Sequence, residues 1–351
     1  AEIDATGEFP WDMKELLAKQ DILAMPFPEA YGGLGSSEVS ILRVIEELAK
    51  ACATTALLLC VQQLGALPIL LVGTEEQKQR FIPKLATGEW LAAYGLTEPG
   101  SGSDAGAMRT RAVRQGDTYV LNGLKHFITN AGIAQVNTIF AVTDPEKGTR
   151  GISAFVVEGD TPGFHPGKVE NKMGIRGSQT GELVFEDCEI PAENLLGKEG
   201  DGFKIALATL DRTRPGIAAQ ALGIAQGALD FAVNYAKQRV QFGKPIIENQ
   251  AIQFMLADMD IQTEAARQLI YHVGELMDEH APSFSRESAI AKTFASDMAI
   301  SVTNDAIQVL GGYGYMKEFP VERMMRDAKI CQIYEGTNQI QRMVIGRALT
   351  K

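Results

Sequence analysis

The sequence predicts an α+β protein with a helical N-terminal domain, a central antiparallel β-barrel or sandwich domain, and a C-terminal four-helix bundle. Three observations indicate this fold class. Residues 11–90 carry helical spacing, residues 91–196 carry short β-type runs between turn signals, and helical spacing returns from residue 202 onward. The domain boundaries that follow from this zoning are residues 1–91, 92–200 and 201–351.

In the N-terminal domain, helices are expected over residues 11–19, 37–59 and 75–85, with Pro and Gly between them. The third of these begins with a capping pattern, because Glu76 and Gln77 follow Thr74 in the expected first turn. Such a pattern satisfies backbone N–H groups that the start of a helix leaves free.

The central domain is predicted from five β-type runs: TYVLNG, HFITN, TIFAV, GISAFVVEG and GELVFEDCEI, all between residues 118 and 190. Turn signals separate them at Asn122-Gly123, Asp144-Pro145 and Thr161-Pro162-Gly163. Many short strands joined by turns are typical of an antiparallel barrel or sandwich.

The C-terminal domain is predicted to be helical over residues 202–238, 246–280, 285–310, 320–330 and 337–349. The first of these stretches is rich in Ala and Gly (GIAAQALGIAQGALDFA). Small side chains let helix axes approach closely, so we expect a bundle.

The composition excludes several classes of protein. The chain of 351 residues is 45% hydrophobic and 22% charged, which suits a globular protein with a large core. Its net charge of −11 and its lack of basic runs disfavour a nucleic-acid partner. The apolar run at residues 51–61 is too short to predict a membrane span. The four scattered cysteines predict free thiols in a reducing compartment, and the four histidines lack the spacing of metal ligands.

One acidic residue stands out as a candidate catalyst. In the stretch IYEGTNQIQR, Glu335 comes directly before Gly336 and a predicted helix that Thr337 or Asn338 would cap. One interpretation is that the carboxylate complements the positive end of the helix dipole in water. The alternative is a desolvated base with a raised pKa, which the preceding Ile333 and Tyr334 and the absence of nearby Lys or Arg favour.

Three further segments are candidate ligand contacts. The loop YGLTEPGSGSDAGA, residues 94–107, would expose backbone N–H groups to a phosphate-bearing ligand, although such loops are often only turns. In KHFITNAG, Phe127 and Thr129 lie on one face of a strand and could present a ring and a hydroxyl to a flat heterocycle, or could simply end a half-buried strand. Arg239 could bind a phosphate in a bidentate way, or could be an ordinary surface charge.

Seven segments, in this order, resemble the acyl-CoA dehydrogenase family, and the resemblance covers essentially the whole chain: LTEPGSGSD, FITN, TRP, RVQFGKP, QVLGGYGY, MRDAKI and IYEGTNQIQ. Within the family the chain is similar to the short- and medium-chain branch, which includes butyryl-CoA dehydrogenases. The resemblance implies a homotetrameric FAD enzyme that oxidises an acyl-CoA to the trans-2-enoyl-CoA and passes electrons to an electron-transferring flavoprotein. It also implies a cytoplasmic location in a bacterium, or the mitochondrial matrix in a eukaryote.

The resemblance implies a role for individual residues. Glu335 would remove the α-proton while the β-hydride moves to flavin N5, and its backbone N–H, with the FAD ribityl 2′-hydroxyl, would bind the enolate oxygen. The implied FAD contacts are Tyr94, Leu96, Thr97, Phe127, Ile128, Thr129, Arg239, Gln241, Phe242, Gln250, Gln308, Val309, Gly311, Gly312, Thr337 and Gln339. Those between Arg239 and Gly312 would reach the FAD of a neighbouring subunit, with Arg239 at the pyrophosphate. The implied substrate contacts are Ser103, Asp211, Arg214, Tyr334 and Gly336.

Departures from the family pattern refine these expectations. Some branches place the base on the first bundle helix, where this chain has Thr213, and this supports Glu335 as the base. No Arg occurs in residues 53–62, which disfavours a decarboxylating role on glutaryl-CoA. Family members usually carry roughly thirty more residues before Ala1, about one helix, so we expect the N-terminal domain to lack its first helix. The alternatives are an acyl-CoA oxidase that uses O₂ and a non-catalytic helical protein that binds flavin or CoA.

Overall fold

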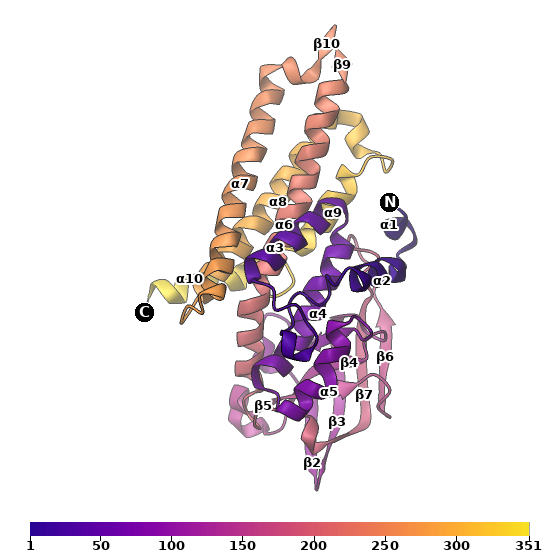
Figure 1. Cartoon of the computed structure of the whole chain (residues 1–351), viewed down its shortest axis with the longest axis vertical. Coiled ribbons are helices and arrows are strands. Elements are labelled where there is room, and N and C mark those ends of the chain that lie inside the picture. Colours follow the sequence, from indigo (N-terminus) through magenta and orange to yellow (C-terminus); the bar gives the residue numbers. More distant parts are fainter. Residues whose placement is uncertain (351) are drawn as a thin grey trace.

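The computed structural model describes residues 1–350. A β-sheet occupies one end of the elongated molecule and a helical bundle rises to the other end, with the N-terminal helices beside their junction (Figure 1). The predicted fold class is confirmed: helical N- and C-terminal parts flank a central sheet.

The N-terminal helices are α1 (Glu2–Thr6), α2 (Trp11–Lys19), α3 (Glu38–Ala51), α4 (Ala53–Val72) and α5 (Glu75–Ala86). The capping pattern of α5 is confirmed, because the Thr74 hydroxyl accepts from the Gln77 N–H at 3.3 Å and the Gln77 side chain accepts from the Thr74 N–H at 2.8 Å.

The predicted helix over residues 37–59 is wrong in two respects. The chain turns at Cys52, which has extended backbone angles (φ −155°, ψ 109°), so that two helices form. The second, α4, then continues past Pro68 to Val72. It is apolar on all sides and almost entirely buried, so it lacks the one-sided periodicity that would have marked its end.

Two helices, α4 and α6 (Gly202–Gln238), are long and apolar enough to cross a membrane by length and composition alone. In each, 72% of the most apolar window is buried inside the protein. Packing against neighbouring elements therefore accounts for their apolar composition.

The sheet consists of β1 (Ala92–Gly95), β2 (Arg111–Gln115), β3 (Thr118–Thr129), β4 (Val136–Val142), β5 (Ile152–Glu158), β6 (Phe164–Val169), β7 (Thr180–Pro191) and β8 (Leu195–Leu196). The strand order is β6-β7-β3-β2-β4-β5-β8, and β1 pairs with β4. Most pairings are antiparallel, as predicted, but β1 and β2 both run parallel to β4, which the prediction of an antiparallel domain did not include. Both reach β4 through longer connections than a hairpin, which parallel pairing requires.

The sheet has a hydrophobic core on each face. Tyr119 of β3 and Phe155 of β5 pack with ring centroids 4.9 Å apart, so the sheet folds back on itself as a sandwich would. The other face packs Phe140 and Val156 against Phe81 of α5 and the start of α6. The N-terminal helices and the first bundle helix are thereby fixed to the sheet.

The C-terminal helices are α6, α7 (Gln250–Asp278), α8 (Ser285–Leu310), α9 (Val321–Ile330) and α10 (Asn338–Leu349), and a hairpin of β9 (Val240–Gln241) and β10 (Lys244–Pro245) follows α6. The small residues of α6 have the expected effect: a Cβ on Gly223 or Gly227 would overlap the backbone oxygens of Glu46 and Lys50 on α3. The helix α3 therefore packs directly on the bundle.

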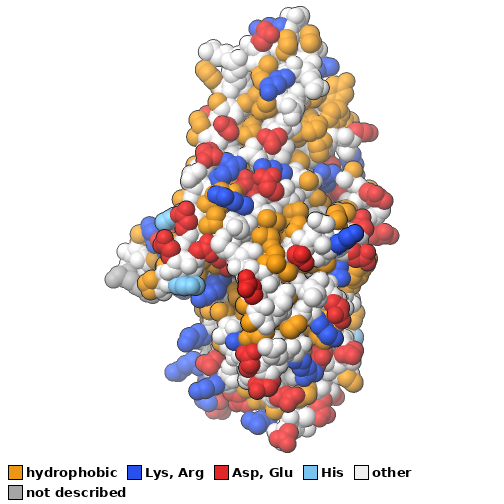
Figure 2. Space-filling model, in the orientation of Figure 1, with side chains coloured by type: hydrophobic (Ala, Val, Ile, Leu, Met, Phe, Trp, Pro, Cys, Tyr) orange, Lys and Arg blue, Asp and Glu red, His pale blue; other side chains and the backbone are white. Residues whose placement is uncertain are grey.

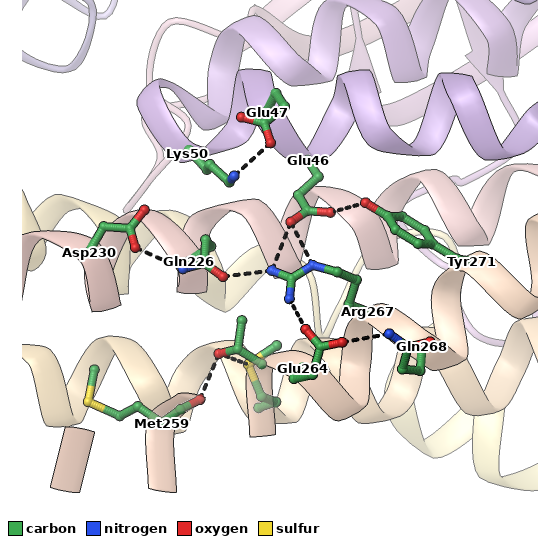
Figure 3. Close-up of polar contacts among 12 residues, drawn as sticks. Glu46, Glu47, Lys50, Gln226, Asp230, Met259, Glu264, Arg267, Gln268 and Tyr271 are labelled. Atoms are coloured by element: carbon green, nitrogen blue, oxygen red, sulfur yellow. Dashed lines mark hydrogen bonds and ion pairs between the residues drawn. The ribbon is translucent and has the colours of Figure 1, made fainter. Parts of the chain in front are cut away.

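A buried polar network joins three of these helices (Figure 3). Glu46 of α3, which is 2% exposed, accepts from Arg267 of α7 at 3.1 and 3.0 Å and from the Tyr271 hydroxyl. Arg267 also donates to Gln226 of α6 at 2.6 Å. Each buried polar group is thus partnered, and the network fixes the register between the N-terminal domain and the bundle.

Candidate active site

The turn that carries Glu335 has an unusual backbone. Glu335 has φ +52° and Gly336 has φ +93°, so two consecutive residues lie in the left-handed region. For a residue with a side chain this costs roughly 1–2 kcal/mol, and surrounding contacts must maintain it. Of the two predicted caps, Thr337 is the one that caps α10, by accepting from the Ile340 N–H at 3.4 Å.

Side chains from three helices hold the two carbonyl groups of this turn. The Glu335 carbonyl accepts from Arg214 Nε of α6 and from Gln341 Nε2 of α10, both at 3.2 Å. The Gly336 carbonyl accepts from Gln341 Nε2 at 2.9 Å and from Lys292 Nζ of α8 at 2.8 Å. Among residues 1–350, the backbone N–H of Glu335 has no protein acceptor.

The Glu335 carboxylate lies in a desolvated but reachable position. Its Oε2 accepts from the Thr213 hydroxyl of α6 at 2.7 Å, and the residue keeps intermediate exposure. Burial raises its pKa to about 7, while the Thr213 hydrogen bond and the positive charges of Arg214 and Lys292 act in the opposite direction. A carboxylate with a pKa near neutrality is suited to accept a proton from carbon.

Several predicted substrate and cofactor residues lie around this carboxylate. Arg214, 3% exposed, forms an ion pair with Asp211. Tyr94 of β1 is close enough that the charge of Glu335 adds to the effect of burial in raising its pKa. On the far side, the Tyr334 hydroxyl donates to Gln220, which donates in turn to the Ala53 carbonyl at 2.8 Å. These contacts tie the residue before Glu335 to α6 and to the start of α4.

The strand residues predicted to face the flavin lie at the exit of β1 and the end of β3. A break in the pairing of β3 with β7 turns Phe127 outward, with φ +59° and 61% exposure. The His126 N–H donates to the Thr97 carbonyl at 2.9 Å and so joins the two segments. Leu96 and Ile128 are buried, the Ile128 side chain belongs to the core, and its backbone pairs with Gly181 of β7.

The Gly/Ser loop is anchored by one buried ion pair. Glu98 accepts from Lys125 Nζ at 2.7 Å and from the backbone N–H groups of Arg109 and Thr110 at 2.6 and 3.0 Å. The tip of the loop, with Ser103, remains exposed. An anchored base with an open tip suits the capture of a ligand from solvent.

A second group of predicted residues lies at the opposite end of the bundle. A cavity of about 460 Å³ there is lined by Tyr235, Arg239, Gln241, Ile246, Val309, Leu310, Gly311, Gly312, Tyr313 and Met316. Phe242 beside it is 98% exposed, with φ +53°. Gln250, Gln308 and, on α10, Gln339 are exposed and do not line this cavity.

This cavity fits an anionic group. Arg239 has no carboxylate within 4.0 Å among the residues that the structure describes, and it stacks over the Tyr313 ring at 5.3 Å. Space is open above Gly311 and Gly312, where an added Cβ would meet no atom within 4 Å. An unpaired guanidinium beside open backbone is suited to a pyrophosphate such as that of FAD.

The two groups of residues are far apart within one chain. Thr213 lies within α6, and Arg239 directly follows the last residue of this helix. At a rise of 1.5 Å per residue, the two lie roughly 40 Å apart. Figure 1 shows the same separation, with the β9–β10 hairpin at the top and the sheet at the bottom. The structure therefore gathers the predicted residues into two groups, one around Glu335 and one around Arg239, and it does not bring the two groups together within one chain.

Three residues at the base were missed by the sequence analysis: Gln220, Lys292 and Gln341, all fully buried. A signal existed for Lys292, because it is a lone charge within the apolar run AIAKTFA and falls on the buried face of a predicted helix. Their partners lie far away in sequence, so only the fold identifies the contacts. No cluster of metal-binding side chains occurs among residues 1–350.

Comparisons with known proteins agree along the whole chain. The chain matches three family models: the acyl-CoA dehydrogenase N-terminal domain over residues 1–89, the middle domain over residues 93–188 and the C-terminal domain over residues 200–350. The short-chain-specific acyl-CoA dehydrogenase of Clostridium acetobutylicum is 51% identical over 98% of this chain and 91% of its own length.

Two solved structures are similar to the whole chain. Butyryl-CoA dehydrogenase from Megasphaera elsdenii superposes with a TM-score of 0.98, at 52% identity, over 100% of this chain and 92% of that chain. A chain in the structure of the electron transferring flavoprotein of Acidaminococcus fermentans gives a TM-score of 0.98 at 51% identity, over 100% and 92% of the two chains.

Proposed function

The chain belongs to the acyl-CoA dehydrogenase family and is an FAD-dependent oxidoreductase, and on this premise we propose that Glu335 is the base that starts the dehydrogenation of a short- or medium-chain acyl-CoA to its trans-2-enoyl-CoA. The observation that carries the proposal is the setting of Glu335: a desolvated carboxylate, oriented by Thr213, with its pKa raised to about 7.

The residues at the base meet the two demands of the reaction. The α-proton of a thioester is only weakly acidic, so the base needs desolvation and the developing enolate oxygen needs fixed donors. Glu335 supplies the carboxylate, and its backbone N–H, which has no protein acceptor among residues 1–350, is free to bind the thioester oxygen. FAD, when bound, accepts the hydride from the β-carbon. Arg214 and Gln341 donate to the Glu335 carbonyl and so hold the backbone of the residue that supplies both groups.

A short acyl chain is favoured by what lies behind the base. The hydrogen-bonded series Tyr334, Gln220 and the Ala53 carbonyl begins at the residue next to Glu335, and Gln220 is fully buried. An acyl chain that extended there would have to break these buried hydrogen bonds, which costs about 1–3 kcal/mol for each group left unsatisfied. The names of the short-chain-specific and butyryl-CoA relatives support the same preference.

We further propose that the FAD site is completed by a second copy of the chain, in a homotetramer. The roughly 40 Å along α6 between Thr213 and Arg239 supports this, because one chain presents the two candidate halves of the site at opposite ends of the bundle. The Arg239 end is also apolar on its surface: Phe242 is 98% exposed and Tyr315 80%. Figure 2 shows hydrophobic side chains frequent over this end of the molecule, as a covered surface would have.

An electron-transferring flavoprotein is the proposed electron acceptor, supported by the similar chain in the Acidaminococcus fermentans structure. Anaerobic addition of butyryl-CoA should bleach the flavin absorbance. Recovery that is slow in air and fast with an electron-transferring flavoprotein supports the proposal. Fast recovery in air would instead indicate an acyl-CoA oxidase, and no bleaching would indicate a non-catalytic protein.

The direct test of the proposed base is Glu335→Gln, which preserves the shape of the side chain. The variant should retain FAD and lose turnover with butyryl-CoA by roughly 10²–10⁴-fold, the usual contribution of a general base. Turnover of C4 to C12 acyl-CoAs by the unaltered enzyme measures the chain-length preference in the same assay. Near-normal turnover of an FAD-loaded Glu335→Gln variant would refute the assignment.

A further inference from the structure

Lys292, in the middle of α8, is a fully buried cation. Its ammonium group donates to the Gly336 carbonyl at 2.8 Å and to Asn338 Oδ1 at 3.0 Å. No carboxylate lies within 4.0 Å of it among residues 1–350, in contrast to Lys125, whose ammonium group is paired with Glu98 at 2.7 Å. Lys292 is therefore buried without an ion partner.

Burial of an unpaired ammonium group lowers the stability of a protein, so such a group is expected to have a functional role. Taking an ammonium group out of water without a counter-ion is strongly unfavourable even after relaxation, and a neutral donor could have satisfied both oxygens. The ionisable groups that face Lys292 are Cys331, Glu335, Arg214 and Asp297. Of the two acids, Asp297 already accepts from Arg342 at 2.8 Å, so Glu335 is the carboxylate left to balance Lys292.

The other cation at the base differs in this respect. Arg214 reaches the Glu335 carbonyl, but its guanidinium also forms an ion pair with Asp211, so its charge is partly neutralised nearby. The hydrogen-bond partners of Lys292, the Gly336 carbonyl and Asn338 Oδ1, are both neutral. In a desolvated site the field of this unpaired charge is weakly screened, and it acts on Glu335 in the same direction as the larger effect of Arg214.

We propose that Lys292 is a positioning residue for the reaction: its ammonium group anchors the left-handed Glu335–Gly336 turn through the Gly336 carbonyl, and its unpaired charge keeps the Glu335 carboxylate ionised and ready to accept a proton. This inference rests on the proposed role of Glu335 and adds the residue that holds that base in its reactive form.

The electrostatic part of the proposal predicts the direction in which the pKa of Glu335 changes when the charge of Lys292 is removed. The charge of Lys292 lowers the pKa of Glu335 against the effect of burial, and the charge of Glu335 raises the pKa of Lys292, which burial alone lowers. Loss of the ammonium charge must therefore raise the pKa of Glu335 above its value of about 7. The base would then be protonated at neutral pH and recover at higher pH.

Two substitutions in the FAD-loaded enzyme separate charge from anchoring. Lys292→Met removes both, while Lys292→Gln removes the charge and keeps a donor for the Gly336 carbonyl. Both should move the acid limb of the pH profile of kcat/KM to higher pH by about one unit, a roughly tenfold loss below pH 7. Only Lys292→Met should also lower the plateau at high pH. Ser296→Ala is the control, since it removes a contact to Asn338 without changing charge and should leave the profile unmoved.

A second readout does not depend on turnover. The carboxyl stretch of protonated Glu335, identified in infrared difference spectra by its absence in Glu335→Gln, should titrate at higher pH in both Lys292 variants. An unshifted pH profile together with an unshifted carboxyl titration in folded, FAD-loaded Lys292→Gln would overturn the inference, even if Lys292→Met failed to fold. If Glu335→Gln itself kept normal turnover, the proposed base would fail and not merely the role of Lys292.

Discussion

At the scale of single residues, the environment of Glu335 decides between the two interpretations of its sequence position. A carboxylate that only complemented a helix dipole would lie in water with an ordinary pKa. Glu335 instead accepts from Thr213 within a desolvated turn, and its pKa is raised to about 7. The sequence could indicate the candidate and its helix cap, because both are local patterns. It could not indicate the contacts that Lys292 and Gln220 make at the base, because these contacts cross 44 and 114 positions of the chain.

Thr213→Val tests the hydrogen bond to the base with little change of volume. The hydrogen bond favours the ionised carboxylate, so its loss should raise the pKa of Glu335 and move the acid limb of kcat/KM upward by about one pH unit. Thr209→Val is a matched control one turn earlier on α6, because the Thr209 hydroxyl donates only to the Ile205 carbonyl. Equal pH profiles for the unaltered enzyme and Thr213→Val would show that this hydrogen bond does not tune the base.

Gln220→Ala tests the limit on acyl-chain length. The substitution removes the partner of the Tyr334 hydroxyl and opens buried space behind the base. The ratio of kcat/KM for octanoyl-CoA to that for butyryl-CoA should rise about tenfold or more, since each extra buried CH₂ contributes about 0.8 kcal/mol. This ratio is its own control for general damage, and a ratio that stayed constant while overall activity fell would contradict the assignment.

At the scale of helices and strands, the sequence predicted elements that show one face to solvent and failed where an element is buried all round. The ends of α8, Ser285–Leu310, agree with the prediction to the residue, and its buried positions recur among partly buried and exposed ones at helical spacing. The helix α4 has no exposed face to set a period, so its break at Cys52 and its extension through Pro68 were not predicted. The parallel pairing of β1 with β4 depends on contacts across 44 residues and leaves no local signal.

The network around Arg267 gives a stability prediction for the contact between α3 and α7. Arg267→Leu leaves Glu46 buried without its counter-charge, which should lower the free energy of unfolding by about 3–5 kcal/mol in denaturant titrations. The double substitution Glu46→Leu with Arg267→Leu should recover most of that loss, because it removes the unpaired charge.

The comparison pair for this test is drawn in the same view (Figure 3). Lys50 and Glu47 form an ion pair at 2.6 Å, but Glu47 is 69% exposed, so Lys50→Ala should change the free energy of unfolding by less than about 1 kcal/mol. Losses of similar size for Lys50→Ala and Arg267→Leu would mean that burial of the network does not govern its contribution.

At the scale of the whole molecule, the chain presents one half of its candidate cofactor site at the sheet and the other at the far end of the bundle. The order of the motifs in the sequence indicated both halves. Their separation of roughly 40 Å follows only from the unbroken length of α6, which the sequence predicted as one helix but could not orient.

Subunit complementation tests whether the halves belong to different copies. Arg239→Ala should weaken FAD retention and Glu335→Gln should abolish turnover, each when expressed alone. Co-expressed, the two variants should form hybrid sites with an intact Glu335 from one copy and an intact Arg239 from another. Activity above the sum of the two separate preparations supports the shared site, whereas no recovery in verified mixed oligomers would show that Arg239 of one copy does not complete the Glu335 site of another.

Removal of the α-proton by Glu335 is the step on which the whole account depends, and hydrogen exchange measures that step alone. Acetyl-CoA has α-hydrogens but no β-carbon, so it can lose a proton to the base without being dehydrogenated. In D₂O, the FAD-loaded enzyme should incorporate deuterium into the acetyl group, as detected by mass spectrometry, and FAD-loaded Glu335→Gln should incorporate none above the uncatalysed rate. Exchange by Glu335→Gln at the rate of the unaltered enzyme would contradict the account.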